Sequence, residues 1–284
     1  FVGVPILQPW YMFPLIAFAA GGNFLIGGTM ALGLALIPAA VYAFMAASMP
    51  RSGGDYVYWS RLMHPALGFM ITLSLVFWIN WWVGTNMWGT AAFFGDLVMD
   101  FGYTGFAEWV YGTTGTVVMG TVLTVVLVLI LMFAFSKYRY VQLISFGWAL
   151  IACIEMIVLV LALAPGFMAN IVQNIGVSEQ QILAMAQEAG FDPTPVLAQS
   201  FLPMMALMWY AMLSPWWSQY ISGEIKSAET LRVQVKAIVL GGFTTGIFTL
   251  LMYGAIAGAF GRDFYNALVY LFYFAPEKYP LGAV

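Results

Sequence analysis

Charged side chains are scarce in this sequence. Asp, Glu, Lys and Arg make up 7% of its 284 residues, and 63% of the residues are hydrophobic. Soluble domains carry about 25% charged residues, so this chain has too few charges to face water on all sides. Its nine basic residues also fall short of the basic surface that nucleic-acid binding requires. The composition indicates a protein of the lipid bilayer with no nucleic-acid partner.

Cysteine and histidine each occur once, as Cys153 and His64. A single cysteine excludes a disulfide within the chain, and we expect Cys153 to be a small core residue. A single histidine excludes haem or copper sites that need several His ligands from this chain. A membrane enzyme or respiratory subunit also needs clustered acids within the bilayer, and only Glu155 lies deep in an apolar segment. We therefore expect no metal, no cofactor and no enzymatic activity.

Long uncharged runs are abundant. A helix crosses the hydrocarbon core with about 20 apolar residues, and the lack of strand alternation favours helices over a barrel. Seven spans are predicted: 1–20, 24–48, 66–95, 114–135, 140–164, 200–221 and 236–261. The run 264–274 is too short to span, and residues 178–190 are typical of a short amphipathic loop helix. The sequence predicts a single all-α, polytopic transmembrane domain over residues 1–284.

Both ends of the chain lie in or near apolar sequence. No charge precedes Arg51, so the positively charged start of a signal peptide is missing. We expect the chain to be incomplete at both ends.

Basic residues are unevenly distributed among the loops. If the first span ends outside the cell, the loops 49–65, 136–140 and 222–236 face the cytoplasm. These loops hold seven of the nine basic residues: Arg51, Arg61, Lys137, Arg139, Lys226, Arg232 and Lys236. The positive-inside rule therefore favours this orientation in the plasma membrane.

Prolines interrupt two of the predicted spans. Pro215 lacks the N–H group that would bond to the carbonyl of Ala211, so we expect an unwound stretch over residues 210–214. Pro5 frees the carbonyl of Phe1 in the same way. Interrupted helices in corresponding positions of two halves indicate a transporter binding site. For either helix alone, a simple proline kink is the alternative.

Two loops carry recognisable patterns. Residues Pro50-Arg51-Ser52-Gly53-Gly54-Asp55-Tyr56-Val57-Tyr58 resemble the P-x-S-G-G-x-Y-x-Y signature of the amino acid-polyamine-organocation (APC) permeases. In that family the signature joins the second and third helices on the cytoplasmic side. Residues Gly223-Glu224-Ile225-Lys226 and Lys236-Ala237-Ile238 are similar to the family's E-x-K-N-P…P-R-A-I loop, although Ser227-Ala228 stands in place of Asn-Pro. The start, Gly3-Val4-Pro5-Ile6, is similar to the end of the family's G-x-G-[IV] break.

The resemblance implies a five-plus-five inverted-repeat fold with discontinuous helices 1 and 6, of which about seven helices lie in this chain. It implies secondary active transport of an amino acid by alternating access. The substrate-binding residues expected at the two breaks are Gly3, Val4, Pro5, Ile6, Tyr210, Ala211, Met212, Leu213 and Ser214. The residues of the signature loop are Pro50, Arg51, Ser52, Gly53, Gly54, Tyr56 and Arg61. No charge lies in either break, which favours a neutral substrate; a proton or a sodium ion is the candidate coupling ion.

Glu155 is the one ionisable residue deep in a predicted span. A carboxyl buried in lipid is costly, its pKa is raised, and it can carry a proton. Some APC permeases couple transport to protons through the fifth helix, so Glu155 is a proton-coupling candidate. The alternative is a neutral carboxylic acid hydrogen-bonded to another helix. We expect Asn80 and Asn86 to form interhelical hydrogen bonds as well.

Two alternative functions remain open. One is another inverted-repeat carrier, for nucleobases or a sodium-coupled solute. The Ser52-Gly53-Gly54 loop favours the permease over this carrier. The other is a permease-derived scaffold or sensor that transports nothing.

Overall fold

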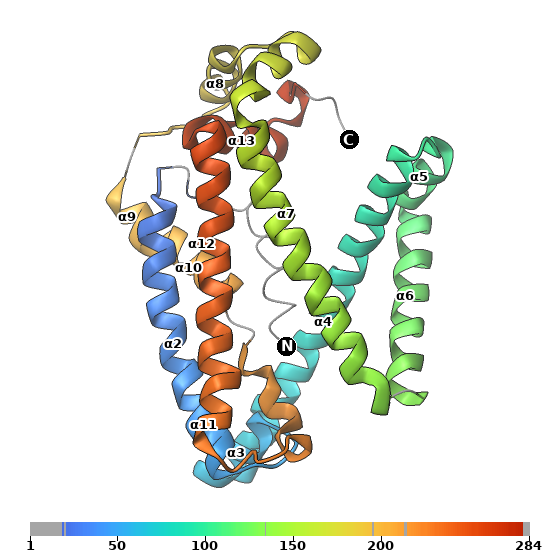
Figure 1. The fold of residues 1–284 in the computed structure, drawn as a ribbon, viewed down its shortest axis with the longest axis vertical. Helices are drawn as coiled ribbons and strands as arrows, with labels where there is room; N and C mark the ends of the chain where they lie inside the picture. The colour runs from blue at the N-terminus through green and yellow to red at the C-terminus, as the bar shows by residue number, and fades with distance from the viewer. Residues whose placement is uncertain (1–18, 20, 134, 195, 213–214, 281–284) are drawn as a thin grey trace. The chain divides into compact units, whose positions relative to one another are not determined.

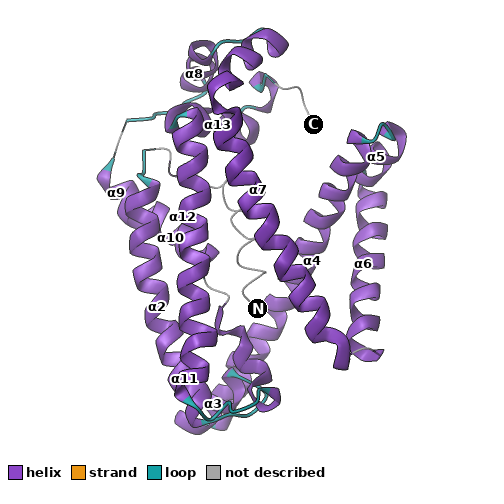
Figure 2. Cartoon of the chain, viewed as in Figure 1, coloured by secondary structure: helices purple, strands orange, loops and turns teal. Residues whose placement is uncertain are grey.

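The computed structural model describes residues 19, 21–133, 135–194, 196–212 and 215–280. Within these ranges the protein is entirely helical and contains no strand (Figures 1 and 2). Five helices are long and apolar enough to cross a membrane: Phe24–Ser48, Pro65–Met99, Thr113–Ile130, Tyr140–Phe167 and Leu231–Phe260. The chain is thus all-α and carries the helices of a multi-pass membrane protein. The predicted span 1–20 lies outside the described residues except for Ala19.

Contacts divide the chain into two units. The first unit comprises Phe1–Gly54 and Ile144–Val284, and the second comprises Asp55–Leu143. Helix α7 (Phe135–Ile175) contributes residues to both units.

Helix α2 (Phe24–Ser48) is central to the first unit and packs against α10 (Met205–Ala211) and α12 (Leu240–Phe260). Its buried face consists mostly of small residues: Gly27, Gly28, Ala31, Ala35, Ala39, Ala43 and Ala46. A Cβ atom added to Gly27 would lie only 2.7 Å from Cγ of Met204. Small residues let helix backbones approach closely in membrane proteins, where lipid gives no hydrophobic force for association. The face of α2 therefore determines how closely its neighbours pack.

The core of the first unit combines aromatic and methionine side chains. The ring of Phe24 stacks on that of Tyr253 with their centroids 3.7 Å apart. Met204, Met208 and Met212 are spaced by four residues and are fully buried. Cys153 is also fully buried, which confirms its predicted place in the core.

The amphipathic helix predicted over residues 178–190 is confirmed as α8 (Glu179–Glu188). Ser178 accepts a hydrogen bond from the N–H of Gln181, whose side chain accepts one from the N–H of Ser178, which forms a capping box. Ile182 and Ala186 on its buried face join a cluster with α13 (Arg262–Phe274), which is followed by η5 (Pro276–Lys278).

The second unit consists of α3 (Asp55–Leu62), α4 (Pro65–Asp100), α5 (Thr104–Tyr111), α6 (Thr113–Phe133) and the start of α7. The predicted loop 49–65 thus contains the short helix α3, and α5 lies between the predicted spans 66–95 and 114–135. His64 caps α4, since its Nδ1 accepts a hydrogen bond from the N–H of Ala66 at 3.2 Å. Tyr111 donates its hydroxyl to Asp96 at 2.5 Å and so ties α5 to α4.

The interhelical hydrogen bonds predicted for Asn80 and Asn86 are wrong. The Nδ2 atom of Asn80 donates to the carbonyl of Val76 at 2.8 Å, and that of Asn86 donates to the carbonyl of Trp82 at 2.7 Å. Both acceptors lie four residues earlier on α4 itself. A carbonyl of the same helix is already within reach of each Nδ2, so these amides donate within α4 rather than to a second helix.

The predicted loop 136–140 is also wrong, because α7 is helical from Phe135 onwards. Lys, Arg and Gln have high helix propensity, so a helix can continue through them beyond the bilayer. At the other end α7 passes through Pro165 and ends at Ile175, although we expected a loop from residue 165. Proline removes only the bond to the carbonyl of Leu161, and the rest of the helix retains its hydrogen bonds.

Candidate functional site

The sixth predicted span is broken near its middle. It begins with α9 (Leu197–Gln199) and the π-helical turn η2 (Ser200–Met204), and α10 ends at Ala211. The N–H of Met212 then bonds to the carbonyl of Trp209 at 3.0 Å, which is a tighter turn than an α-helix makes. A 3₁₀ segment, η3 (Pro215–Glu224), follows the break.

The position of the break follows from the chemistry of Pro215. Its missing N–H leaves the carbonyl of Ala211 without a helical donor, and α10 ends at this residue. Tyr210 and Ala211, which we expected in the unwound stretch, are instead the last residues of α10. The reason is that proline removes a donor only from carbonyls in the preceding turn. The N–H groups of Tyr210 and Ala211 still bond to carbonyls four residues earlier in α10.

The other predicted substrate residues are described only in part. Met212 is fully buried in the core of the first unit, beside the methionines of α10 and η2. Gly3, Val4, Pro5, Ile6, Leu213 and Ser214 lie outside the described residues. The predicted meeting of the two breaks therefore stays a prediction.

The signature loop packs directly against η3. The N–H of Gly53 donates to the carbonyl of Tyr220 at 3.1 Å. Gly54 has a φ of +48°, and a Cβ atom there would collide with the Tyr220 ring. On the facing segment, a Cβ atom on Gly223 would lie 2.7 Å from Oγ of Ser52. Glycines on both sides thus allow the loop and the segment after the break to touch.

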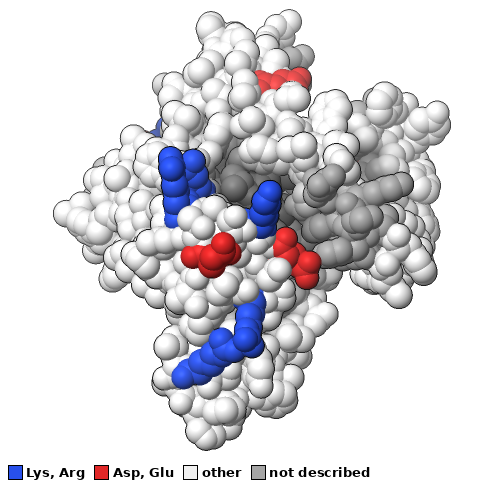
Figure 3. All heavy atoms as spheres, turned by 60° about the horizontal axis from the view of Figure 1, so that its bottom comes forward, with Lys and Arg blue, Asp and Glu red and all other residues white. Residues whose placement is uncertain are grey.

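Three of the remaining signature residues are exposed. Arg51 is exposed in the loop, next to Pro50, whereas Tyr56 and Arg61 are exposed on α3 in the second unit. The loop, η3 and the residues that follow η3 carry these exposed charges of the first unit: Arg51, Glu224, Lys226, Glu229, Arg232 and Lys236. Figure 3, which brings the α11 end of Figure 1 forward, shows basic and acidic side chains on an otherwise uncharged surface. Helix α11 (Leu231–Gln234) and the π-helical turn η4 (Val235–Val239) lead from this end into α12.

No protein-family model, curated protein or solved structure matches the chain. Among the described residues, no group of three or more His, Cys, Asp or Glu could hold a metal ion.

Three polar residues of η3 were missed by the sequence analysis. Ser218, Gln219 and Ser222 are 6%, 0% and 0% exposed. Among the residues that the structure describes, the hydroxyls of both serines and both amide atoms of Gln219 have no hydrogen-bond partner. One signal could have identified them, because Gln219 is the only amide side chain in the predicted span 200–221.

Glu155, the predicted proton-coupling residue, faces away from the protein core, and its role stays a prediction. It lies near the middle of α7 and is exposed, although Cys153 and Val160 on the same helix are buried. The helix turns its Cys153 side toward the core of the first unit, and Glu155 falls outside that side. The described residues of the protein therefore do not bury its carboxylate.

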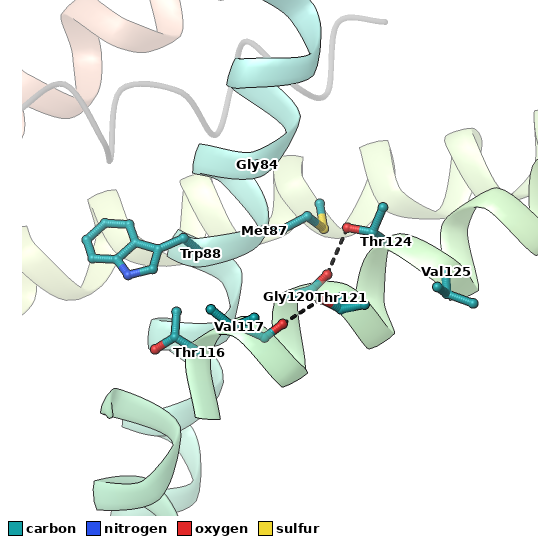
Figure 4. A pocket seen from close by; sticks show the side chains of 9 residues that line it. All are labelled: Gly84, Met87, Trp88, Thr116, Val117, Gly120, Thr121, Thr124 and Val125. Carbon is teal, nitrogen blue, oxygen red and sulfur yellow. Dashed lines mark hydrogen bonds between the residues drawn. The ribbon is translucent and has the colours of Figure 1, made fainter. Parts of the chain in front are cut away.

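The second unit contains an apolar cavity of about 350 Å³ between α4 and α6. Its lining, shown in Figure 4, is Gly84, Met87, Trp88, Thr116, Val117, Gly120, Thr121, Thr124 and Val125. Thr121 and Thr124 donate their hydroxyls to carbonyls of α6 itself, at 2.7 and 2.8 Å. Because these two hydroxyls bond within α6 and the lining is mostly apolar, this cavity has the character of a lipid-facing groove rather than a site for a polar solute.

Proposed function

We propose that the protein is an amino acid permease of the APC type, a secondary active transporter that works by alternating access. The observation that carries the proposal is the contact of Ser52, Gly53 and Gly54 with η3. Two segments whose sequences resemble APC loops pack against each other, and one of them directly follows the broken helix. Two short motifs that contact each other in the fold support the resemblance more strongly than two motifs that lie apart.

The proposed substrate is a neutral amino acid. Carbonyl groups at the end of α10 suit an ammonium group, since the C-terminal end of a helix carries partial negative charge. In the proposal, the free amides near Gly3 and Ile6 hold the carboxylate, as helix N-termini commonly hold anions. No ionisable residue occurs at residues 1–6 or 210–214, so a charged side chain on the substrate has no counter-charge there.

The proposed location is the plasma membrane, with the loops 49–65 and 222–236 and the start of α7 at residues 136–140 in the cytoplasm. The exposed basic side chains Arg51, Lys226, Arg232 and Lys236 at one end of the first unit support this orientation. Glu155 is the proposed proton-coupling residue, and sodium is the other candidate coupling ion.

A ligand screen tests the proposal. The thermal midpoint of the full-length protein is measured with each common amino acid, with and without sodium and at several pH values. A neutral amino acid present at 100 times its Kd should stabilise the protein by about 2.7 kcal/mol. Nucleobases are the matched controls. A shift with a nucleobase and none with amino acids would favour another carrier, and no shift with either would favour a scaffold.

A further inference from the structure

Segment η3 is held from one side by the signature loop. The loop contacts Tyr220 through the Gly53 hydrogen bond and Gly223 through Ser52. Successive residues of a 3₁₀ helix are rotated by about 120°, so the neighbours of these two residues face other directions. A kink at Ile221 divides the segment, but the loop contacts residues on both sides of that kink. The loop thus fixes the rotation of both parts of η3.

The residues that precede each contact are Gln219 and Ser222. Both are fully buried, and in the described part of the chain neither the Gln219 amide nor the Ser222 hydroxyl has a hydrogen-bond partner. Ser218, directly before Gln219, is 6% exposed, and its hydroxyl also has no hydrogen-bond partner within the described ranges. Buried polar groups in native proteins nearly always have a partner, which is another group, an ordered water or a ligand. Three exceptions on one short segment therefore indicate a place that water or a solute fills.

We propose that Ser218, Gln219 and Ser222 form a second polar subsite, a hydrated compartment that binds the solute after it leaves the broken helix. The inference rests on the proposed function for the identity of the solute. It places the subsite on η3, beyond the end of α10 at Ala211, toward the end of the first unit that carries the signature loop. The site of the proposed function lies at the break itself and uses backbone groups, whereas this one uses side chains.

The chemistry of the three side chains defines the ligand class. An amide offers two N–H donors and a carbonyl acceptor, and each serine hydroxyl both donates and accepts. All three are neutral, and the one charged residue of η3, Glu224, is exposed. Neutral groups that donate and accept suit a zwitterion, because they can bind its carboxylate and its ammonium without favouring a net charge. A solute with net charge would find no counter-charge on these side chains.

The first experiment measures binding to the full-length protein. The probe is the amino acid that gives the largest thermal shift with the wild type. Gln219→Met keeps the volume of the side chain but removes its hydrogen-bonding groups, and Ser222→Ala removes one hydroxyl. We expect each to weaken binding about tenfold, the value of one hydrogen bond. The thermal midpoint without ligand should stay constant or rise, because each substitution removes a buried polar group that has no hydrogen-bond partner among the described residues.

The matched control for this experiment is Thr249→Val in α12. Thr249 is also a fully buried polar residue, but its hydroxyl donates to the carbonyl of Thr245 at 2.9 Å. Its removal should leave amino acid binding unchanged. If Gln219→Met and Ser222→Ala both bind the amino acid as tightly as wild type, the subsite does not exist.

A second experiment reports on the compartment without an amino acid. Cys153 is the only cysteine, so Ser222→Cys in a Cys153→Ala background carries a single thiol. In right-side-out and inside-out vesicles, this thiol should react with a membrane-impermeant methanethiosulfonate from the side of the signature loop. The bound amino acid should slow the reaction. A thiol that is inert from both sides would overturn the inference, even if Gln219→Met fails to fold.

The two experiments separate this inference from the proposed function. If the wild type binds an amino acid but the thiol is inert and Gln219→Met has no effect, only the second subsite is refuted. If the wild type binds no amino acid, the proposed function fails. A reactive thiol at position 222 then supports the compartment for another neutral solute, and an inert thiol overturns it.

Discussion

Gly53 and Tyr220 are joined by a backbone hydrogen bond of 3.1 Å, although they belong to segments far apart in the sequence. Gly54 lies beside the Tyr220 ring with a positive φ that side chains rarely adopt. This contact joins the loop after α2 to the 3₁₀ segment η3, and it does not involve the apolar face of a membrane helix. This relationship makes the stability of η3 depend on the glycines of the loop.

Gly54→Ala should lower the thermal midpoint of the protein. Its left-handed backbone costs about 1–2 kcal/mol for a residue with a Cβ atom, and the collision with Tyr220 adds to this. The control is Gly102→Ala, where φ is +86° but no atom lies within 4 Å of the added Cβ. The larger loss should occur at Gly54. Equal losses would mean that backbone strain alone acts and that the Tyr220 contact is loose.

Gly27→Ala should destabilise the packing of α2. The added Cβ atom would lie 2.7 Å from Cγ of Met204 and 2.8 Å from the carbonyl oxygen of Ser200. Overpacking of this kind costs about 1–3 kcal/mol, which chemical unfolding in detergent can measure. Gly33→Ala on the same helix is the control, since no atom lies within 4 Å there. It should stabilise the helix by about 0.5–1 kcal/mol, and a similar gain for Gly27→Ala would contradict the close approach.

Pro215→Ala should reduce uptake in proteoliposomes by about tenfold without lowering the thermal midpoint. Alanine supplies the missing N–H, so the carbonyl of Ala211 gains a helical partner and no longer interacts with substrate. A factor of ten corresponds to about 1.4 kcal/mol. Pro38→Ala in α2 is the matched control, because Pro38 lies inside a helix that continues to Ser48. Normal uptake by the Pro215 variant would remove the break from the mechanism.

Glu155→Gln should make uptake by the full-length protein independent of pH. Glutamine has the size of the carboxyl but stays neutral, so it cannot take up or release a proton. Glu179→Gln, an exposed residue at the start of α8, serves as the control and should leave the pH profile unchanged. A Glu155→Gln protein with the full pH dependence of the wild type would exclude proton coupling through this residue.

The sequence determined those features that depend on local chemistry. Composition and run length indicated helices of membrane-spanning length, and Pro215 predicted the end of α10 near Ala211. Ser178 and the apolar positions after it predicted α8. Each of these depends on residues within a few turns of one another, where hydrogen-bond partners and hydrophobicity can be read directly.

Only the tertiary structure decided which faces meet. It brought Gly53 to Tyr220, buried Gln219 without a partner, and left Glu155 exposed. It also gave Asn80 an acceptor on its own helix. A membrane helix is apolar all round, so its sequence carries little information about which side packs against protein and which against lipid. That choice depends on close steric fit between segments distant in the chain, which hydropathy does not encode.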